Sequence, residues 1–563
     1  MNQVSQQRTL QDIENELDIT ILPGTEVMVD VGSHHFIKSG NGGGEARVLV
    51  PQPSDDPLDP LNWTYTWKLI TIICASFVSI SQNLGPLANA PLFGLTPRKL
   101  VSECAQELMS FETGLYMEEW NVSLADAVQT TAVAILVLGF SNLIWIPIST
   151  CFGRRPALIF STLICTVSSI WRVRSTSYKS FLGASALNGF GAGPCESLMP
   201  QIIADIIFLH DRGKYQTLYF SIYFGSLSIG PIIAGSMAER FGWRSFWWLN
   251  TGLLIFTLFL NFALLPETRF ARKREHKTVP EPSPLIDEPE TKGSSVVDHS
   301  EDASGQEPQD KWLSRGHPSL KQFNLWGPYQ GSILQELWLP WYLHAFPIVE
   351  FAAFAVSFSA SGFLVANLTQ QQFFGAPPYN FSTQSVGFTN FAIFTGSMIG
   401  LLTSGPLSDW VANYFTKRNR GIREPEMRLI AMLPYTLIMI IGLVVVGVGY
   451  SRLWSWKVIV IIGYTCLGMQ VTSLPSIAST YAIDSYKPAT GAIFVTITIN
   501  KNLWGYGFGK FITPWTEQIG YLAPLMTLMT LITFFCSFGI LFWFCGKYFR
   551  GLTKNSFLHK LDS

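Results

Sequence analysis

Long apolar runs separated by short polar stretches make up most of the chain. The hydrocarbon core of a bilayer is about 30 Å thick, so a helix that crosses it needs about 20 mostly apolar residues. Twelve runs have this character, at residues 67–86, 125–147, 157–173, 181–208, 218–238, 245–266, 340–367, 385–406, 429–449, 457–480, 491–515 and 524–549. The pattern predicts an all-α membrane protein with twelve transmembrane helices, six before and six after one long polar interval.

The polar segments divide the chain into two six-helix bundles, a linker and two tails. Residues 267–339 are rich in Pro, Ser, Asp and Glu, and such a composition buries too little apolar surface to fold. We therefore expect a largely disordered linker there, between a bundle at 67–266 and a second bundle at 340–549. Residues 1–66 and 550–563 form the N-terminal and C-terminal tails.

The composition agrees with lipid as the solvent for most of the chain. The sequence is 48% hydrophobic and 14% charged, whereas about a quarter of the residues are charged in soluble domains. The eight cysteines are scattered without a C-x-x-C pair or a ligand-like spacing. We expect no metal, no other cofactor and no nucleic-acid partner.

Basic residues mark one face of the predicted membrane protein. Lys and Arg favour short cytoplasmic loops, and they follow the second run (Arg154, Arg155), the fourth run (Arg212, Lys214) and the eighth run (residues 417–428). The opposite first loop is instead rich in glutamate. This asymmetry predicts a multi-pass protein with both tails and the linker in the cytoplasm. We expect it in the plasma membrane, with the vacuolar membrane as the alternative.

N-x-S/T sequons provide an independent check, because they are glycosylated only outside the cytosol. Asn121 and Asn380 fall in loops placed outside, Asn367 sits at a membrane edge, and Asn62 would lie inside. The first three are candidates for N-glycosylation.

A loop motif recurs at equivalent places in the two halves. Residues 146–155 (IPISTCFGRR) follow the second run, and residues 405–410 (GPLSDW) follow the eighth. Such a recurrence indicates two homologous halves. Cations near helix C-termini are favoured by the backbone dipole, so these loops could latch one conformation, although the charges could also serve only to fix the topology. The candidate gating residues are Gly153, Arg154, Arg155, Asp205, Gly405, Asp409 and Arg418.

These loops resemble the signature loops of the major facilitator superfamily. Segments 50–63 (VPQPSDDPLDPLNW) and 266–268 (PET) look like the markers of its fungal drug:proton antiporter-like branch, and the resemblance covers almost the whole chain. It implies the major facilitator fold, in which two six-helix bundles with pseudo-two-fold symmetry alternate access to a central cavity. The chain departs from the family at Thr150, where an acid is usual, and at Ser185, where an arginine linked to proton transfer is usual. The gate of the first half should therefore be weaker, and proton coupling stays open.

The fifth run carries a glycine and proline pattern similar to the motif associated with antiporters in this superfamily. Glycines let helices approach closely, and a proline bends the helix by removing a hydrogen bond. The pattern favours export, although close packing alone would also explain it. Its residues are Gly225, Gly230, Pro231 and Gly235.

Ionisable residues inside apolar runs are costly in lipid, so each is a candidate functional residue. Glu196 is the first candidate for proton coupling, Glu350 is the second, and Lys501 is a candidate counter-ion. Purely structural pairing is the alternative for all three. In the family, helices one, four, seven and ten line the cavity, and polar residues at middling depth in those runs are Gln82, Asn83, Asn188 and Gln470.

The preferred function is proton-coupled efflux of a small organic compound, such as a drug, toxin or secondary metabolite, by alternating access. Proton-coupled uptake of a polar nutrient or organic cation is the alternative. No loop carries the set of residues that an enzyme requires, and no G-x-x-x-x-G-K-[ST] phosphate loop is present. We expect a monomeric transporter, with a small molecule, protons and the bilayer as its partners.

Overall fold

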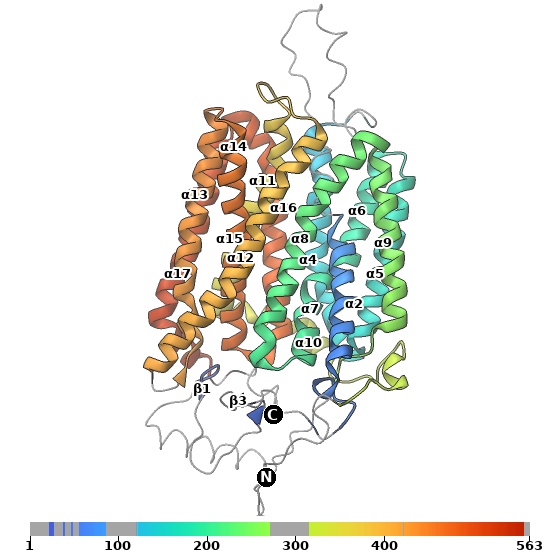
Figure 1. Ribbon diagram of the computed structural model, residues 1–563, viewed down its shortest axis with the longest axis vertical. Helices are drawn as coiled ribbons and strands as arrows, with labels where there is room; N and C mark the ends of the chain where they lie inside the picture. Colours follow the sequence, from blue (N-terminus) through green and yellow to red (C-terminus); the bar gives the residue numbers. More distant parts are fainter. Residues whose placement is uncertain are drawn as a thin grey trace, which may run out of the picture.

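The computed structural model describes residues 22–27, 38–39, 47–48, 54, 56–85, 120, 122–270, 315–419, 422–554 and 556. Its main elements are long helices that run roughly parallel (Figure 1). The predicted all-α membrane fold is thereby confirmed.

Helices occupy all six predicted runs of the first half. The fourth run is divided at Gly193, because Pro194 and its missing N–H begin a new helix there. The helices are α2 (Tyr65–Asn83), α4 (Leu124–Phe152), α5 (Arg154–Arg174), α6 (Tyr178–Ala192), α7 (Pro194–Ile206), α8 (Leu209–Phe241) and α9 (Trp243–Leu264).

Helices also occupy the six predicted runs of the second half, but the seventh run (340–367) starts in α10, is interrupted at residues 344–346 and continues as α11. The tenth run begins with α14 and a π-helical segment, η5, and then continues as α15. The elements are α10 (Ile333–Leu343), α11 (Pro347–Phe374), α12 (Thr383–Arg418), α13 (Met432–Ser451), α14 (Trp456–Val458), η5 (Ile459–Tyr464), α15 (Thr465–Ser485), α16 (Thr490–Ile519) and α17 (Leu522–Leu552). Short helical turns are η1 (Pro60–Asn62), η3 (Leu320–Phe323), η4 (Pro425–Ala431) and η6 (Lys487–Ala489).

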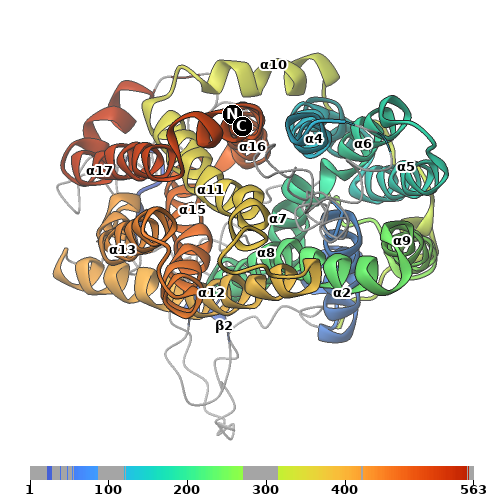
Figure 2. The same cartoon turned by 90° about the horizontal axis from the view of Figure 1, so that it is seen from above.

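The helices form two bundles that meet along a central seam. Figure 2 shows α2 and α4–α9 on one side and α11–α17 on the other. At the seam α8 packs along α12, and α4 packs along α16. The helix α10 lies beside α4 and α16 and so touches both bundles, and the Thr496 hydroxyl of α16 donates to the Pro340 carbonyl at 2.9 Å.

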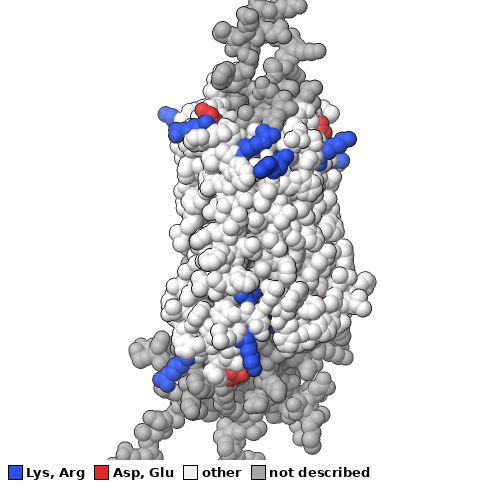
Figure 3. Space-filling model, turned by 90° about the vertical axis from the view of Figure 1, so that its right-hand side faces the viewer, with Lys and Arg blue, Asp and Glu red and all other residues white. Residues whose placement is uncertain are grey.

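The outer surface matches a lipid environment. Within the described residues, nine helical segments are long and apolar enough to cross a membrane. The face in Figure 3 has a broad uncharged band, with Lys, Arg, Asp and Glu gathered toward its two ends. Large apolar side chains such as Phe259 and Phe262 of α9 are more than 60% exposed, which suits contact with acyl chains.

Besides the short helix α10, four described α-helices lie outside that set of nine, and each carries buried polar residues. They are α2, the divided pair α6 and α7, and α16. Buried polar residues such as Asn83, Glu196 and Asn502 lie on them. Their composition is less apolar because one face of each is committed to polar contacts rather than to lipid.

Two small sheets lie outside the bundles. β1 (Glu26–Val27) pairs antiparallel with β4 (Ile422–Arg423), and β2 (Lys38–Ser39) pairs antiparallel with β3 (Arg47–Val48). We use the position of β1 and β4 to name one end of the molecule the β1–β4 face (Figure 1).

The described part of the predicted linker packs on the first bundle. Residues 271–314 lie outside the described residues, whereas Gly316 bonds to Asn62 and Thr64 through the backbone. Further along, the Gly327 N–H donates to the Phe152 carbonyl at 3.0 Å, and Trp326 packs edge-on against Phe152. Residues 315–330 of the predicted linker therefore form an ordered strap along the first bundle, and residues 333–339 belong to α10, which touches both bundles.

Candidate functional site

A buried carboxylate, Glu196, lies where the two bundles meet. It sits in the first turn of α7, just after the break at Gly193 and Pro194, and is 7% exposed. Its Oε1 accepts from the Tyr223 hydroxyl of α8 and lies 2.5 Å from Lys501 Nζ of α16. Its Oε2 accepts from Asn502 Nδ2 at 3.2 Å. Three donors from α8 and α16 thus converge on one carboxylate.

The ion pair between Glu196 and Lys501 joins the two bundles. Lys501 Nζ also donates to the Tyr223 hydroxyl at 3.2 Å and lies 5.4 Å from the centre of that ring. Two opposite charges in a low-dielectric interior compensate each other only when their geometry and hydrogen bonds are good. The structure therefore brings two of the three predicted coupling residues into direct contact.

A cavity opens beside this pair. Its walls are mostly apolar, with a few polar groups, which is the character of sites for small organic molecules. The lining residues are Asn83, Ile135, Leu138, Glu196, Tyr223, Phe224, Leu227, Ala360, Ser361, Phe363, Leu364, Lys501, Asn502 and Gly505.

Of the four predicted cavity residues, Asn83 lines this cavity. Its Oδ1 accepts from Cys195 Sγ at 3.1 Å, and its buried Nδ2 has no hydrogen-bond partner among the described residues. A buried donor without a partner is costly, so it is available to a bound ligand or water.

The other three predicted cavity residues make contacts within one bundle. Gln82 donates to the Ser161 and Thr162 hydroxyls of α5. Gln470 of α15 exchanges two hydrogen bonds with Ser359 of α11. Asn188 is buried in α6 and is not among the residues that line the cavity.

Glu350 lies apart from the Glu196 pair. It is in the first turn of α11, and its carboxylate contacts Nδ1 of His344, the residue that ends α10. It does not line the cavity. The second predicted coupling residue therefore belongs to a local pair at a helix end.

The gating loop of the first half is organised around Glu267, which the sequence marked only as part of the PET segment and not as a gating residue. Its carboxylate accepts the backbone N–H groups of Arg154 at 2.8 Å and Arg155 at 3.1 Å, and so caps the start of α5. Gly153 has φ +124°, and an added Cβ would lie 2.2 Å from Glu267 Oε2. Arg154 Nε also bonds to Asp205 Oδ2 at 3.2 Å. An acid thus stands at this loop, supplied from the end of the sixth run rather than from position 150.

The gating loop of the second half forms a chain of ion pairs. Asp409 Oδ1 lies 3.3 Å from Arg428 and 3.9 Å from Arg423, and Arg428 also bonds to Asp484 at 3.0 Å. Gly405 lies inside α12, and Arg418 is its last residue. These contacts tie α12 to the start of the ninth run and to the end of α15.

Two glycines of the fifth run, Gly225 and Gly235, lie at the seam, and Gly230 faces the end of α2 within the first bundle. An added Cβ would meet the Leu84 carbonyl oxygen at 2.4 Å from Gly230, and the Thr383 carbonyl oxygen at 2.8 Å from Gly235. At Gly225 it would meet the Phe394 ring of α12 at 3.2 Å, and Pro231 lies inside α8. The pattern thus allows α8 to approach the end of α2 and, across the seam, α12.

The three glycosylation candidates differ in their exposure to solvent. Asn380 is exposed in the connection between α11 and α12, with φ +49°. Asn367 is fully buried in α11, where its Nδ2 donates to the Phe363 carbonyl, so it is not accessible to a modifying enzyme. Asn121 lies outside the described residues.

Sequence reasoning did not single out Tyr223 or Asn502 as functional residues. Both bond directly to Glu196. Tyr223 lies two positions before Gly225 of the fifth-run pattern, and that proximity was the available signal.

Comparisons with known proteins agree with this architecture. The Major Facilitator Superfamily model matches residues 100–501. An uncharacterised MFS-type transporter of Schizosaccharomyces pombe is 26% identical over 96% of this chain and 94% of its own length. Protein HOL1 of Saccharomyces cerevisiae is 23% identical over 92% of both chains. A probable efflux pump, mfs2, of Aspergillus flavus is 23% identical over 78% of this chain and 98% of its own.

A solved structure shows the same fold. The human organic anion transporter MFSD10 (TETRAN) aligns with 84% of this chain and 99% of its own, with a TM-score of 0.52 and 15% sequence identity. The family model covers most of the chain, so the protein belongs to the major facilitator superfamily of membrane transporters.

Proposed function

We propose that the protein exports a small organic compound in exchange for protons, and that Glu196 is the coupling carboxylate. The observation that carries this proposal is the placement of Glu196. It is buried, it lines the cavity between the bundles, and it is bonded to a cation of the opposite bundle. Intramembrane acids with these features commonly serve as proton relays.

The contacts of Glu196 suggest how a proton would act on the transport cycle. The ionised carboxylate accepts three hydrogen bonds, from Tyr223, Lys501 and Asn502. Protonation removes the negative charge and one acceptor, so the attraction that holds Lys501 across the seam is lost. The two bundles are then free to rock, and release of the proton on the other side restores the pair.

Export is the direction that the seam supports. The close contacts of Gly230 with α2 and of Gly235 with α12 leave little room for solvent beside α8. Among the relatives, mfs2 is described as a probable efflux pump. The compound would be amphipathic, because aromatic residues such as Phe224 and Phe363 share the cavity with Glu196.

Flux in liposomes tests the coupling. Metabolites in cells and medium, compared with and without the gene, would first supply the substrate. We expect wild-type protein to accumulate it against its gradient when a pH difference is imposed, and Glu196→Gln to lose this uphill transport. Glu350→Gln is the matched control, since Glu350 lies outside the cavity. Uphill transport that survives in Glu196→Gln would show that the assignment is wrong.

Proton-coupled uptake of a polar nutrient or organic cation is the second candidate. It is favoured by Glu196 as an acidic wall of the cavity, which could bind a cationic substrate in place of Lys501. The direction of labelled substrate flux in a deletion strain separates the two functions.

We further propose that the transporter works as a monomer in the plasma membrane with both tails in the cytoplasm. One chain supplies all the groups that contact Glu196, and the clustering of basic residues in alternate loops supports the orientation.

A further inference from the structure

A short N-terminal segment, residues 22–27, lies against the second bundle, although the chain later enters α2 of the first bundle. Its strand β1 pairs antiparallel with β4, with Val27 opposite Ile422. The strand β4 belongs to the connection between α12 and α13. The segment therefore sits on the loop that carries the gate of the second half.

The segment begins with a tight turn that fits the surface below it. The Thr25 N–H donates to the Leu22 carbonyl at 3.0 Å, and Gly24 has φ +84°. Pro followed by Gly at the centre of such a turn is typical of type II. An added Cβ on Gly24 would lie 2.5 Å from the Asp484 carbonyl oxygen. The turn thus presses directly on the end of α15, and only glycine fits there.

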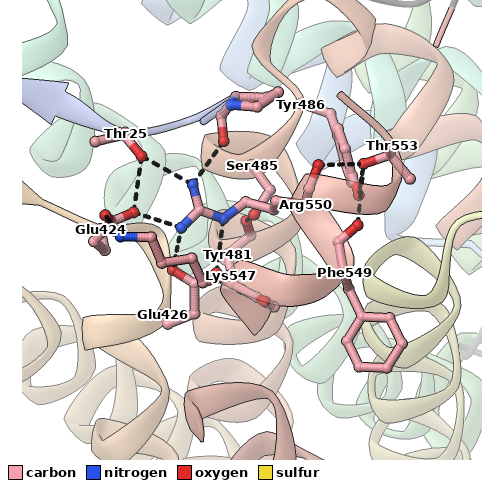
Figure 4. A network of polar contacts seen from close by, with 11 residues as sticks. Thr25, Glu424, Glu426, Tyr481, Ser485, Tyr486, Lys547, Phe549, Arg550 and Thr553 are labelled. Carbon is pink, nitrogen blue, oxygen red and sulfur yellow. Dashed lines mark hydrogen bonds and ion pairs between the residues drawn. The ribbon is translucent and has the colours of Figure 1, made fainter. Parts of the chain in front are cut away.

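The guanidinium of Arg550, at the end of α17, connects this segment to the second bundle (Figure 4). The Arg550 side chain is fully buried, and its Nε and Nη2 bond to the carboxylates of Glu424 and Glu426. Its Nη1 donates to the Pro23 carbonyl at 2.7 Å and to the Thr25 hydroxyl at 3.1 Å. Nε and Nη2 of the guanidinium thus bond to the second bundle, and Nη1 bonds to the N-terminal segment.

The Thr25 hydroxyl completes the connection, because it donates to Glu424 Oε2 at 2.8 Å. Loss of the segment would leave Arg550 paired with both glutamates. The bundle could therefore keep its own charge balance when the segment leaves, which is a requirement for reversible binding.

The same segment touches the ion pairs of the gate at two points. Arg423 of β4 is the residue opposite Glu26 and lies 3.9 Å from Asp409. Asp484, whose backbone carbonyl faces Gly24, forms an ion pair with Arg428 through its side-chain carboxylate. A rearrangement of this gate during transport would disturb both contacts.

We propose that residues 22–27 act as a reversible clip, which binds the β4 edge and Arg550 in one state of the transport cycle and leaves in the other. The proposal rests on alternating access between the two bundles, as in the proposed function. The contact is a two-residue strand pair, one turn and three side-chain hydrogen bonds, which is small enough to release on the timescale of transport. The clip thereby adds a control element outside the substrate cavity.

A disulfide across the β1–β4 pair tests the proposal in the full-length protein. Val27→Cys with Ile422→Cys places two cysteines at opposite Cα positions. Ser361→Cys, on the cavity wall, reports which side of the membrane reaches the cavity. A membrane-impermeant maleimide is added to either face of sealed vesicles, and labelling at position 361 is read by mass spectrometry of its peptide.

We expect the reduced protein to be labelled from both faces. After oxidation, labelling from one face should fall at least tenfold, and a reductant should restore it. Val27→Cys without Ile422→Cys is the control for oxidation. Unchanged labelling from both faces after complete cross-linking would overturn the proposal. Because labelling needs neither substrate nor a proton gradient, its result is independent of proton coupling at Glu196.

A second variant removes the clip without a cross-link. Gly24→Leu cannot adopt the turn or fit against Asp484. Its matched control is Gly551→Ala, where an added Cβ meets nothing within 4 Å. We expect Gly24→Leu to change the ratio of the two labelling rates at position 361 at least threefold, with the control unchanged. An unaltered ratio in Gly24→Leu would also overturn the proposal.

Discussion

Lys501 and Glu196 form an ion pair across the seam between the two bundles, with Nζ 2.5 Å from Oε1. Lys501 comes from α16 of the second bundle and Glu196 from α7 of the first. Their side chains are only 16% and 6% exposed. A charged contact of this kind depends on the relative position of the bundles, so it reports the conformational state directly.

Replacing Lys501 alone should destabilise the protein more than replacing Lys501 and Glu196 together. Lys501→Met leaves the Glu196 carboxylate buried beside Tyr223 and Asn502 without a cation, and breaking a buried pair in this way costs about 3 kcal/mol. We expect a lower melting temperature of the detergent-purified protein and loss of transport. The double variant Glu196→Gln with Lys501→Met should regain most of the stability but not the coupling.

Lys510→Met is the matched control for this prediction, because Lys510 lies on the same helix and is exposed. Its free energy of unfolding should lie within about 0.5 kcal/mol of the wild-type value, as is usual for surface substitutions. If the double variant were less stable than Lys501→Met alone, the pair would not be the source of the loss.

The helices could be predicted from the sequence because lipid imposes a length and a composition on each span. The predicted run 340–367 reads as one apolar segment with almost no charge, and most of it lies in one helix, α11 (Pro347–Phe374). The break inside the fourth run was visible only as Pro194 and Pro200. Since Pro200 stays inside α7, proline alone does not tell which position divides a helix.

The sequence predicted the two charged residues of the coupling site but not the groups around them. Glu196 and Lys501 were found because a charge inside an apolar run is costly and therefore rare. Tyr223 was not found, because the chain has 18 tyrosines and the only signal for this one was its place two residues before Gly225. Gln82 and Gln470 show the remaining limit. Whether a polar side chain faces the cavity or its own bundle depends on helix rotation, which one sequence does not give.

Tyr223 should matter through its hydroxyl rather than its ring. Tyr223→Phe keeps the aromatic wall of the cavity but removes the donor to Glu196. A hydrogen bond to a charged group contributes about 1.5–3 kcal/mol, so we expect proton-driven transport in liposomes to fall about tenfold or more. Tyr548→Phe, at an exposed position of α17, should transport as wild type. Equal rates in the two variants would exclude a role for the Tyr223 hydroxyl.

Gly153 should be intolerant of any side chain. Its φ of +124° is strained for other residues, and a Cβ would clash with the Glu267 carboxylate at 2.2 Å. We expect Gly153→Ala to destabilise the protein by about 2 kcal/mol, as strained backbone positions do, in a thermal unfolding assay. Gly252→Ala, in α9 with open space around its Cβ, should be neutral or slightly stabilising. A neutral Gly153→Ala would mean that the loop and Glu267 move apart easily.

Glu424 should make the stability of the β1–β4 face depend on pH. Burial by itself raises the pKa of Glu424, but the charge of Arg550 and hydrogen bonds from Arg550 and Thr25 outweigh burial and hold the pKa below its ordinary value of 4.5. A carboxyl group with a lower pKa in the folded state stabilises the fold above its ordinary pKa, and this contribution is lost as the pH falls through the folded value. We therefore expect stability from this contact to be constant from pH 7 to about 5 and to decline below 4.5.

The variant Glu424→Gln isolates this effect, because glutamine does not titrate. Its unfolding temperature should be lower than that of wild type at pH 7, since Arg550 and Lys547 lose a carboxylate partner. The two curves should converge as the pH falls from 4.5 through the lower pKa of the folded protein, because the wild-type carboxyl is then protonated in both the unfolded and the folded state. Glu517→Gln, at an exposed position of α16, should follow wild type throughout. Parallel curves for Glu424→Gln and wild type across the whole range would show that Glu424 keeps the same charge in folded and unfolded protein, and the Arg550 cluster would then not be the cause of its lowered pKa.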